Sequence, residues 1–127
     1  MYIGKFDQQA NFDCGAKERK QLTDENMQVV MQIILAGGNA KNFAMQAITA
    51  AKNGDFTLAQ QQMDNADKSL VEAHNVQTNM LTKEAQGQHT PVDLYMVHAQ
   101  DHLMTAITFK DLANEVVAVY QRLATES

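Results

Sequence analysis

The residues of this chain best suited to chemistry lie in one short run, VHAQDHLMT at positions 97–105. On a helix, His98 and Asp101 are three positions apart and His98 and His102 are four apart, so the three side chains lie on adjoining faces. At about 100° per residue, these faces coincide with a stripe of apolar side chains. A buried unpaired charge is costly in such a place, and it is usually retained for function or for helix register.

A metallohydrolase is the first class of protein that this spacing allows, because two histidines four residues apart on a helix can ligate zinc. The order His98-x-x-Asp101-His102 is similar to the His-x-x-Glu-His arrangement of some zinc enzymes, but Asp replaces the required Glu. A third protein ligand is not evident in the sequence. The spacing therefore gives an incomplete catalytic zinc site.

Phosphoryl transfer through an imidazole is the second alternative. A histidine with a pKa of about 6.5 is largely neutral and nucleophilic at neutral pH. Such a site needs one exposed histidine, hydrogen-bond donors that Gln100 and His102 could supply, and a surface where two partners dock in turn. The third alternative is a helical adaptor without chemistry, in which the polar cluster fixes helix register. Spacing alone does not separate the second alternative from the third.

Long helices are expected to position this run, because strand signals are absent. Three signals divide residues 23–125 into segments of roughly 30 residues: a helix stop and an N-cap at Asn53-Gly54-Asp55, a stop at Gly87, and a start at Thr90-Pro91-Val92-Asp93. In the last of these, Thr90 is the expected cap and Pro91 the first helical residue. Thr23 opens the first segment. Short connections between long helices imply antiparallel neighbours. The sequence therefore predicts an all-α fold, an up-down-up antiparallel three-helix bundle.

The third segment differs from the others because it carries two apolar faces. One face holds Met96, Val97, Leu103, Met104 and Ile107, and the other holds Leu94, Leu112, Val116, Val119 and Leu123. A three-helix bundle needs only one buried face per helix, so we expect this helix also to pack against copies of itself. A broad core face within a monomer is the alternative.

Composition and charge narrow the class of protein further. The net charge is −5 and there is no basic run, so nucleic acid is not an expected partner. No apolar stretch approaches the roughly 18 residues of a membrane helix, and the N-terminus lacks the apolar core of a signal peptide. We therefore expect a cytoplasmic protein without direct membrane insertion. Residues 1–22 have no clear period, which predicts a flexible N-terminal extension before a functional domain at 23–127.

The run around His98 resembles the active-site signature of the IIA component of the lactose/cellobiose (N,N'-diacetylchitobiose) family of phosphoenolpyruvate-dependent sugar phosphotransferase systems. The likeness extends to AKNGDF at 51–56, to EAHNVQT at 72–78, and to LMT at 103–105 followed by KDL at 110–112. These motifs cover roughly residues 23–124, in order and at matching spacing. The resemblance favours a phosphoryl carrier over a hydrolase or an adaptor.

The resemblance implies a role for each residue of the run. His98 matches the histidine that accepts a phosphoryl group from the histidine phosphocarrier protein and donates it to a cysteine of the cognate IIB component, for uptake and phosphorylation of a β-linked disaccharide. Gln100 and His102 match positions beside the phosphoryl group. Asp101 matches an acid that meets its two symmetry mates on the threefold axis of a homotrimer, a nine-helix bundle, where the family binds a metal ion usually taken as magnesium.

The predicted self-association gives that last feature a physical reason. Three Asp101 carboxylates that converge in a low-dielectric seam must be protonated or neutralised by a cation. A hard divalent ion with oxygen ligands, such as Mg²⁺, suits this site and would have a structural role. His74 is interpreted as a packing or partner-facing residue and His89 as a solvated one. Close approach of a neighbouring helix would explain the helical pair Gly37-Gly38.

Overall fold

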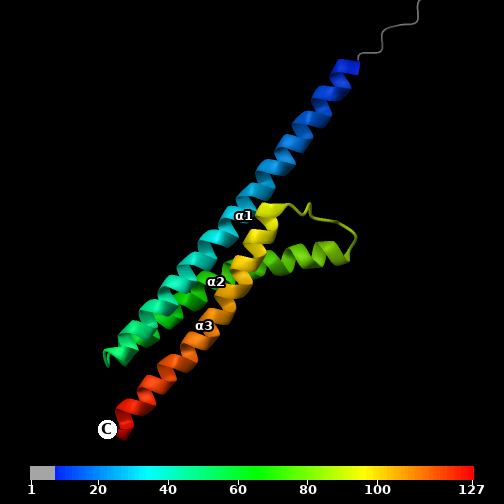
Figure 1. Ribbon diagram of the computed structural model, residues 1–127. Coiled ribbons are helices and arrows are strands. Elements are labelled where there is room, and N and C mark those ends of the chain that lie inside the picture. The colour runs from blue at the N-terminus through cyan, green and yellow to red at the C-terminus, as the bar shows by residue number, and fades with distance from the viewer. Residues whose placement is uncertain (1–7) are drawn as a thin grey trace, which may run out of the picture.

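Residues 8–127 of the computed structural model form three long helices, and side-chain detail is described for residues 24–127. The helices are α1 (Gln8–Lys52), α2 (Phe56–Ala85) and α3 (Leu94–Glu126). Figure 1 shows that α1 and α3 run in the same direction, while α2 runs back along them. Both α2 and α3 pack mainly against α1 and much less against each other. The predicted all-α bundle with up-down-up topology is confirmed.

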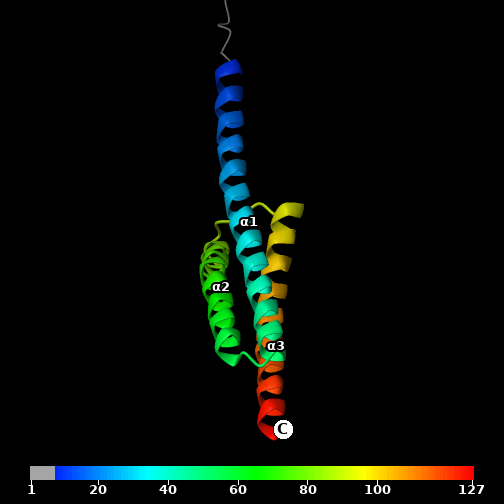
Figure 2. The same ribbon diagram turned by 90° about the vertical axis from the view of Figure 1, so that its left-hand side faces the viewer.

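The first helix begins at Gln8 and not at Thr23, so the predicted helix start is wrong. Residues 8–22 are rich in Ala, Lys, Glu, Arg and Gln and contain no proline, and an existing helix gains one hydrogen bond for each residue added. The N-terminal part of α1 extends beyond the other two helices in both views (Figures 1 and 2). Residues 1–7 lie outside the described residues. The boundary of the functional domain at residue 22 stays a prediction.

The connection between α1 and α2 has the structure that the sequence predicts. Gly54 adopts a φ of 81°, which suits glycine, and its N–H donates to the Ala51 carbonyl at 3.0 Å. The Asp55 carboxylate accepts a hydrogen bond from the Leu58 N–H at 3.0 Å and so caps α2. These contacts turn the chain back within three residues of the end of α1.

The connection between α2 and α3 differs from the prediction at its second end. Gly87 has a φ of 83° just past the end of α2, as expected. The N-cap of α3 is Asp93, whose carboxylate accepts from the Met96 N–H at 2.9 Å, and not Thr90. The Thr90 N–H donates instead to the Glu84 side chain at 3.1 Å, so this residue fastens the connection to the end of α2. A carboxylate placed closer to the helix provides the stronger cap.

The core is built largely from small side chains, which lets the helices approach closely. Ile33 of α1 and Leu103 of α3 are the largest side chains that are fully buried. The second half of α2 turns away from α1 (Figure 1), and the buried residues of α2 end at Ala73. Because α2 diverges there, α3 packs most firmly against α1, beside the histidine run. Among the described helices, none has an apolar stretch long enough to cross a membrane.

Candidate functional site

His98 and His102 lie side by side on α3, as their spacing predicts. The two rings are stacked, with centroids 5.9 Å apart and planes inclined by 18°. His98 is exposed, whereas His102 is half-buried between α3 and α1. The pair therefore presents one imidazole to an incoming molecule and keeps the second imidazole beneath it.

Two glycines of α1 lie beside His102, and the first of them leaves the space that its ring occupies. A Cβ on Gly37 would lie 3.0 Å from Cδ2 of His102 and 3.4 Å from the backbone oxygen of the same residue. A Cβ on Gly38 would lie 3.7 Å from Nε2 of His102. The predicted close approach of a neighbouring helix at this glycine pair is confirmed.

The surroundings of His102 favour its neutral form. Burial lowers the pKa of His102, and the positive charges of Lys41 and, when protonated, His98 lower it further. A hydrogen bond to the backbone of Ile34 and the charge of Asp101 raise the pKa, but their effect is smaller. His102 is consequently an uncharged imidazole at neutral pH.

Lys41 is the residue of this site that the sequence analysis missed. It is half-buried on α1 and lines an open groove with Thr105 and Phe109 of α3. The positive charge of Lys41 lowers the pKa of His102. Lys41 follows Gly38 by three positions and Gly37 by four, so it lies on the same side of α1 as the glycine pair. That spacing is the signal that could have identified it.

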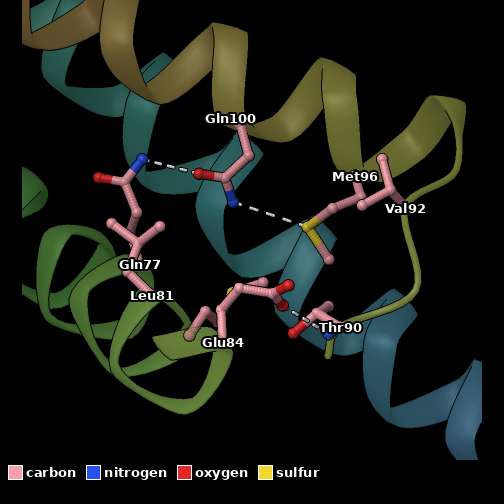
Figure 3. Close-up of a pocket in the computed structure, with 8 residues that line it drawn as sticks. Gln77, Leu81, Glu84, Thr90, Val92, Met96 and Gln100 are labelled. Carbon is pink, nitrogen blue, oxygen red and sulfur yellow. Dashed lines mark hydrogen bonds between the residues drawn. The ribbon is translucent and has the colours of Figure 1, made fainter. Parts of the chain in front are cut away.

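Gln100 lies on the other side of α3, away from His98 of its own chain. Two positions on an α-helix differ by about 200° in direction. The Gln100 Oε1 accepts a hydrogen bond from Gln77 Nε2 of α2 at 2.7 Å, and Gln100 Nε2 lies 3.6 Å from the Met96 sulfur (Figure 3). These residues line a mostly apolar cavity of about 220 Å³ between α2 and α3. Within one chain, the predicted contact between Gln100 and a group on His98 is therefore not made.

The face of α3 that carries His98 and Asp101 is exposed. Large apolar side chains continue this face along the helix; they are 56–83% exposed and comprise Leu94, Leu112, Val119 and Leu123, which we call the α3 stripe. Val116, which was predicted to belong to the same face, is half-buried instead. Asp101 is exposed within it. The prediction that α3 has a second apolar face outside the core of one chain is confirmed, and the alternative of one broad core face is wrong.

The predicted composition of the first face of α3 needs a correction. Val97 and Met104 are about half exposed, at 52% and 50%, and lie outside the core. The buried line consists instead of Met96, Leu103 and Val117 with three alanines between them, at 99, 106 and 113. Alanines lie in the close contact with α1, so a count of large side chains alone misplaces the centre of this face.

The other ionisable side chains within residues 24–127 do not form a metal site within one chain. Within residues 24–127, no three His, Cys, Asp or Glu side chains gather closely enough to hold a metal ion, so these residues do not supply the third ligand that a hydrolase needs. His89 is exposed, as predicted, but its Nδ1 lies 2.6 Å from Glu84 Oε1. His74 is exposed on α2 in a shallow groove lined also by Lys110.

Fold and site together define an all-helical protein that presents a stacked imidazole pair on an exposed apolar helix face. Residues 28–121 match the family model described as PTS system, Lactose/Cellobiose specific IIA subunit. The PTS system cellobiose-specific EIIA component of Lactococcus lactis subsp. lactis (strain IL1403) is 56% identical over 107 residues, which is 84% of this chain and 92% of the relative. The chain belongs to the lactose/cellobiose IIA family, and it is a component of a phosphotransferase.

Solved structures agree with this assignment. The crystal structure of the PTS cellobiose-specific enzyme IIA from Bacillus anthracis matches with a TM-score of 0.76 and 42% identity, over 79% of this chain and 92% of that chain. The solution structure of the IIA(Chitobiose)–HPr complex from the N,N'-diacetylchitobiose branch of the Escherichia coli phosphotransferase system matches with a TM-score of 0.67 and 38% identity, over 77% of this chain and 95% of that chain.

Proposed function

We propose that this chain carries a phosphoryl group on His98. It accepts the group from a histidine phosphocarrier protein and donates it to a cysteine of a cognate IIB component, in a system that takes up and phosphorylates a β-linked disaccharide. The observation that carries this proposal is the exposed imidazole of His98, stacked at 5.9 Å on His102 within the signature run of the family. The Escherichia coli relative in complex with HPr supports the choice of donor.

The transfer is an exchange of one bond to phosphorus for another. A ring nitrogen of His98 uses its lone pair to form a bond to phosphorus, while the bond to the donor histidine breaks and its electron pair returns to the donor ring. In the second step a cysteine thiolate forms the new bond, and the electron pair returns to His98. Such transfers depend mainly on in-line positioning and on stabilisation of charge. An open site and a neutral nucleophile are what this chain must supply.

The groups around His98 have distinct parts in this proposal. Neutral His102 lies under the accepting ring and is the polar neighbour of an incoming phosphoryl group. Lys41 supplies a positive charge on the α1 side, which stabilises the added negative charge through Coulomb attraction. Gln100 is turned towards α2 in its own chain, so its predicted phosphoryl contact requires the His98 of another chain.

The assembly that this function implies is a homotrimer built through the α3 stripe. Leu112 and the other stripe residues are exposed in a single chain and would be covered by copies of α3. Asp101 lies on the same face, so the three copies would bring three carboxylates together. Their oxygen-only donor set fits a hard divalent cation such as Mg²⁺. When bound, the ion would neutralise the carboxylates and stabilise the trimer.

The surface around His98 suits a protein partner. Tyr95 and Val97 are exposed apolar residues within one turn of His98 and lie outside the α3 stripe, with exposed fractions of 60% and 52%. We propose that the parts of this surface left open by the trimer receive the phosphocarrier protein and the IIB component in turn. A shared docking surface is sufficient because the same histidine takes part in both steps.

Phosphorylation of purified variants tests the proposal. The protein is incubated with phosphoenolpyruvate and the general phosphotransferase proteins, and its intact mass is measured before and after mild acid. We expect the parent and His74→Ala to gain one acid-labile phosphoryl group per chain, and His98→Ala to gain none. His74 is the matched control because it is another exposed helical histidine. Uptake by His98→Ala contradicts the assignment, and an unphosphorylated parent favours the adaptor.

A further inference from the structure

We propose that Gly37 is a positioning residue for phosphoryl transfer: the space left by its missing side chain seats His102, and the seated ring of His102 orients His98. This inference rests on the proposed function of His98 as the phosphoryl acceptor. It concerns a residue of α1 that touches neither the accepting ring nor the incoming group.

The backbone of α1 does not itself require glycine at these positions. Neither Gly37 nor Gly38 has a positive φ, in contrast to Gly54 and Gly87 in the turns. A glycine within a helix costs about 1 kcal/mol relative to alanine, so the pair is unfavourable for the helix itself. The reason for glycine must therefore lie in the space beside the helix.

The two glycines differ in how much space they leave. A Cβ on Gly38 would make an ordinary contact of 3.7 Å with His102 Nε2. A Cβ on Gly37 would lie 3.0 Å from Cδ2, which is tighter than most contacts of a Cβ, and 3.4 Å from the backbone oxygen of His102. The 3.4 Å distance to the backbone oxygen is an ordinary van der Waals contact, so the crowding at position 37 falls on the ring of His102, which must shift by a few tenths of an ångström. The position of the His102 ring therefore requires glycine at position 37 but not at position 38.

A displacement of His102 reaches His98 through their stacking. The rings are nearly parallel, at 18°, and belong to successive turns of the same helix. Ala99 and Leu103, each next to one of the two histidines, are completely buried, so the backbone of α3 cannot easily shift to absorb a crowded ring. A misplacement of about 1 Å can lower the rate of an oriented reaction about 100-fold, so a shift of a few tenths of an ångström is significant.

The matched pair Gly37→Ala and Gly38→Ala tests this inference, because both variants replace a helical glycine by alanine and only one creates the crowded contact. The initial rate of phosphoryl uptake is measured against the concentration of phosphorylated carrier protein. We expect Gly37→Ala to lower the maximal rate about tenfold with an unchanged half-saturating concentration, and Gly38→Ala to stay within about twofold. NMR signals of the ring protons of His98 and His102 should shift in Gly37→Ala alone.

A double-variant cycle shows whether Gly37 acts through His102. In a His102→Ala background the crowded ring is absent, so adding Gly37→Ala should cause no further loss of rate. If Gly37→Ala alone does not fold, Gly37→Ala/His102→Ala should restore the fold, and failure to restore it overturns the inference. A parental maximal rate and unmoved ring signals in Gly37→Ala also overturn it, while phosphorylation of His98 stands. Absence of phosphate from His98 in the parent overturns the proposed function itself.

Discussion

Replacement of Leu112 by alanine should weaken the proposed homotrimer without unfolding the helical bundle. Leu112 lies in the α3 stripe and is 60% exposed in one chain, so most of its apolar surface is free to be covered by a neighbouring α3. Alanine keeps the helix intact because its helix propensity is at least as high as that of leucine. The change therefore acts on the surface between chains.

The size of the effect follows from the exposed surface of the side chain. Full burial of a leucine side chain is favourable by about 2 kcal/mol, so covering the 60% that is exposed contributes about 1 kcal/mol per chain. Each trimer contains three copies of the residue, so the loss is about 3 kcal/mol per trimer. That free energy corresponds to a decrease of roughly a hundredfold in the association constant of the trimer.

Sedimentation equilibrium over a range of protein concentrations measures this constant, and circular dichroism checks the helix content. Leu81→Ala is the matched control, because Leu81 is 63% exposed on α2 but lies outside the α3 stripe. We expect Leu112→Ala to dissociate at concentrations where the parent and Leu81→Ala remain trimeric. Equal association of all three proteins, or an equal loss in Leu81→Ala, would refute the role of the α3 stripe.

Three further predictions concern the stability of the fold and of the trimer. Hydrogen bonds from His89 and Thr90 lower the pKa of Glu84 from its ordinary value of 4.5, so ionised Glu84 stabilises the folded state above pH 4.5. This stabilisation is lost as the pH falls from 4.5 through the lowered pKa of Glu84. The urea concentration at the unfolding midpoint should therefore fall less on acidification for Glu84→Gln than for the parent. An equal dependence of the midpoint on pH in both proteins would contradict this. Leu103→Ala should lower the free energy of unfolding by about 2–5 kcal/mol in urea titrations, because the side chain is fully buried, and a loss below about 1 kcal/mol would be inconsistent with that burial. Asp101→Leu should associate at least as strongly as the parent in the presence of a chelator, because it removes three converging charges, and dissociation under those conditions would show that the carboxylate itself is needed.

Much of the fold could be predicted from local signals. Gly54, Asp55 and Gly87 act within a few residues of themselves, so their positions in the sequence predict the two chain reversals. The start of α1 could not be predicted in this way, because a helix continues through residues that merely tolerate it, and nothing before Thr23 ends it. Thr90 failed as a cap because Asp93 competes with it nearer to the helix.

The site was predictable where its residues share one helix. His98 and His102 are stacked because four positions bring them together on α3, and this depends on no other element. The position of Gln100 against Gln77 and the proximity of Lys41 to His102 depend on how α1 and α2 pack against α3. Spacing along a single helix carries no information on such contacts, which is why both escaped the sequence analysis.

The most direct test of the central claim is to locate the phosphorus atom on the intact protein. Uniformly ¹⁵N-labelled protein is phosphorylated by the carrier protein, and its histidine ring nitrogens are observed by long-range ¹H–¹⁵N correlation with and without ³¹P decoupling. We predict that a nitrogen of His98 shows a coupling to phosphorus, while the rings of His74, His89 and His102 show none. A coupling on any of those three rings, with none on His98, would contradict the account.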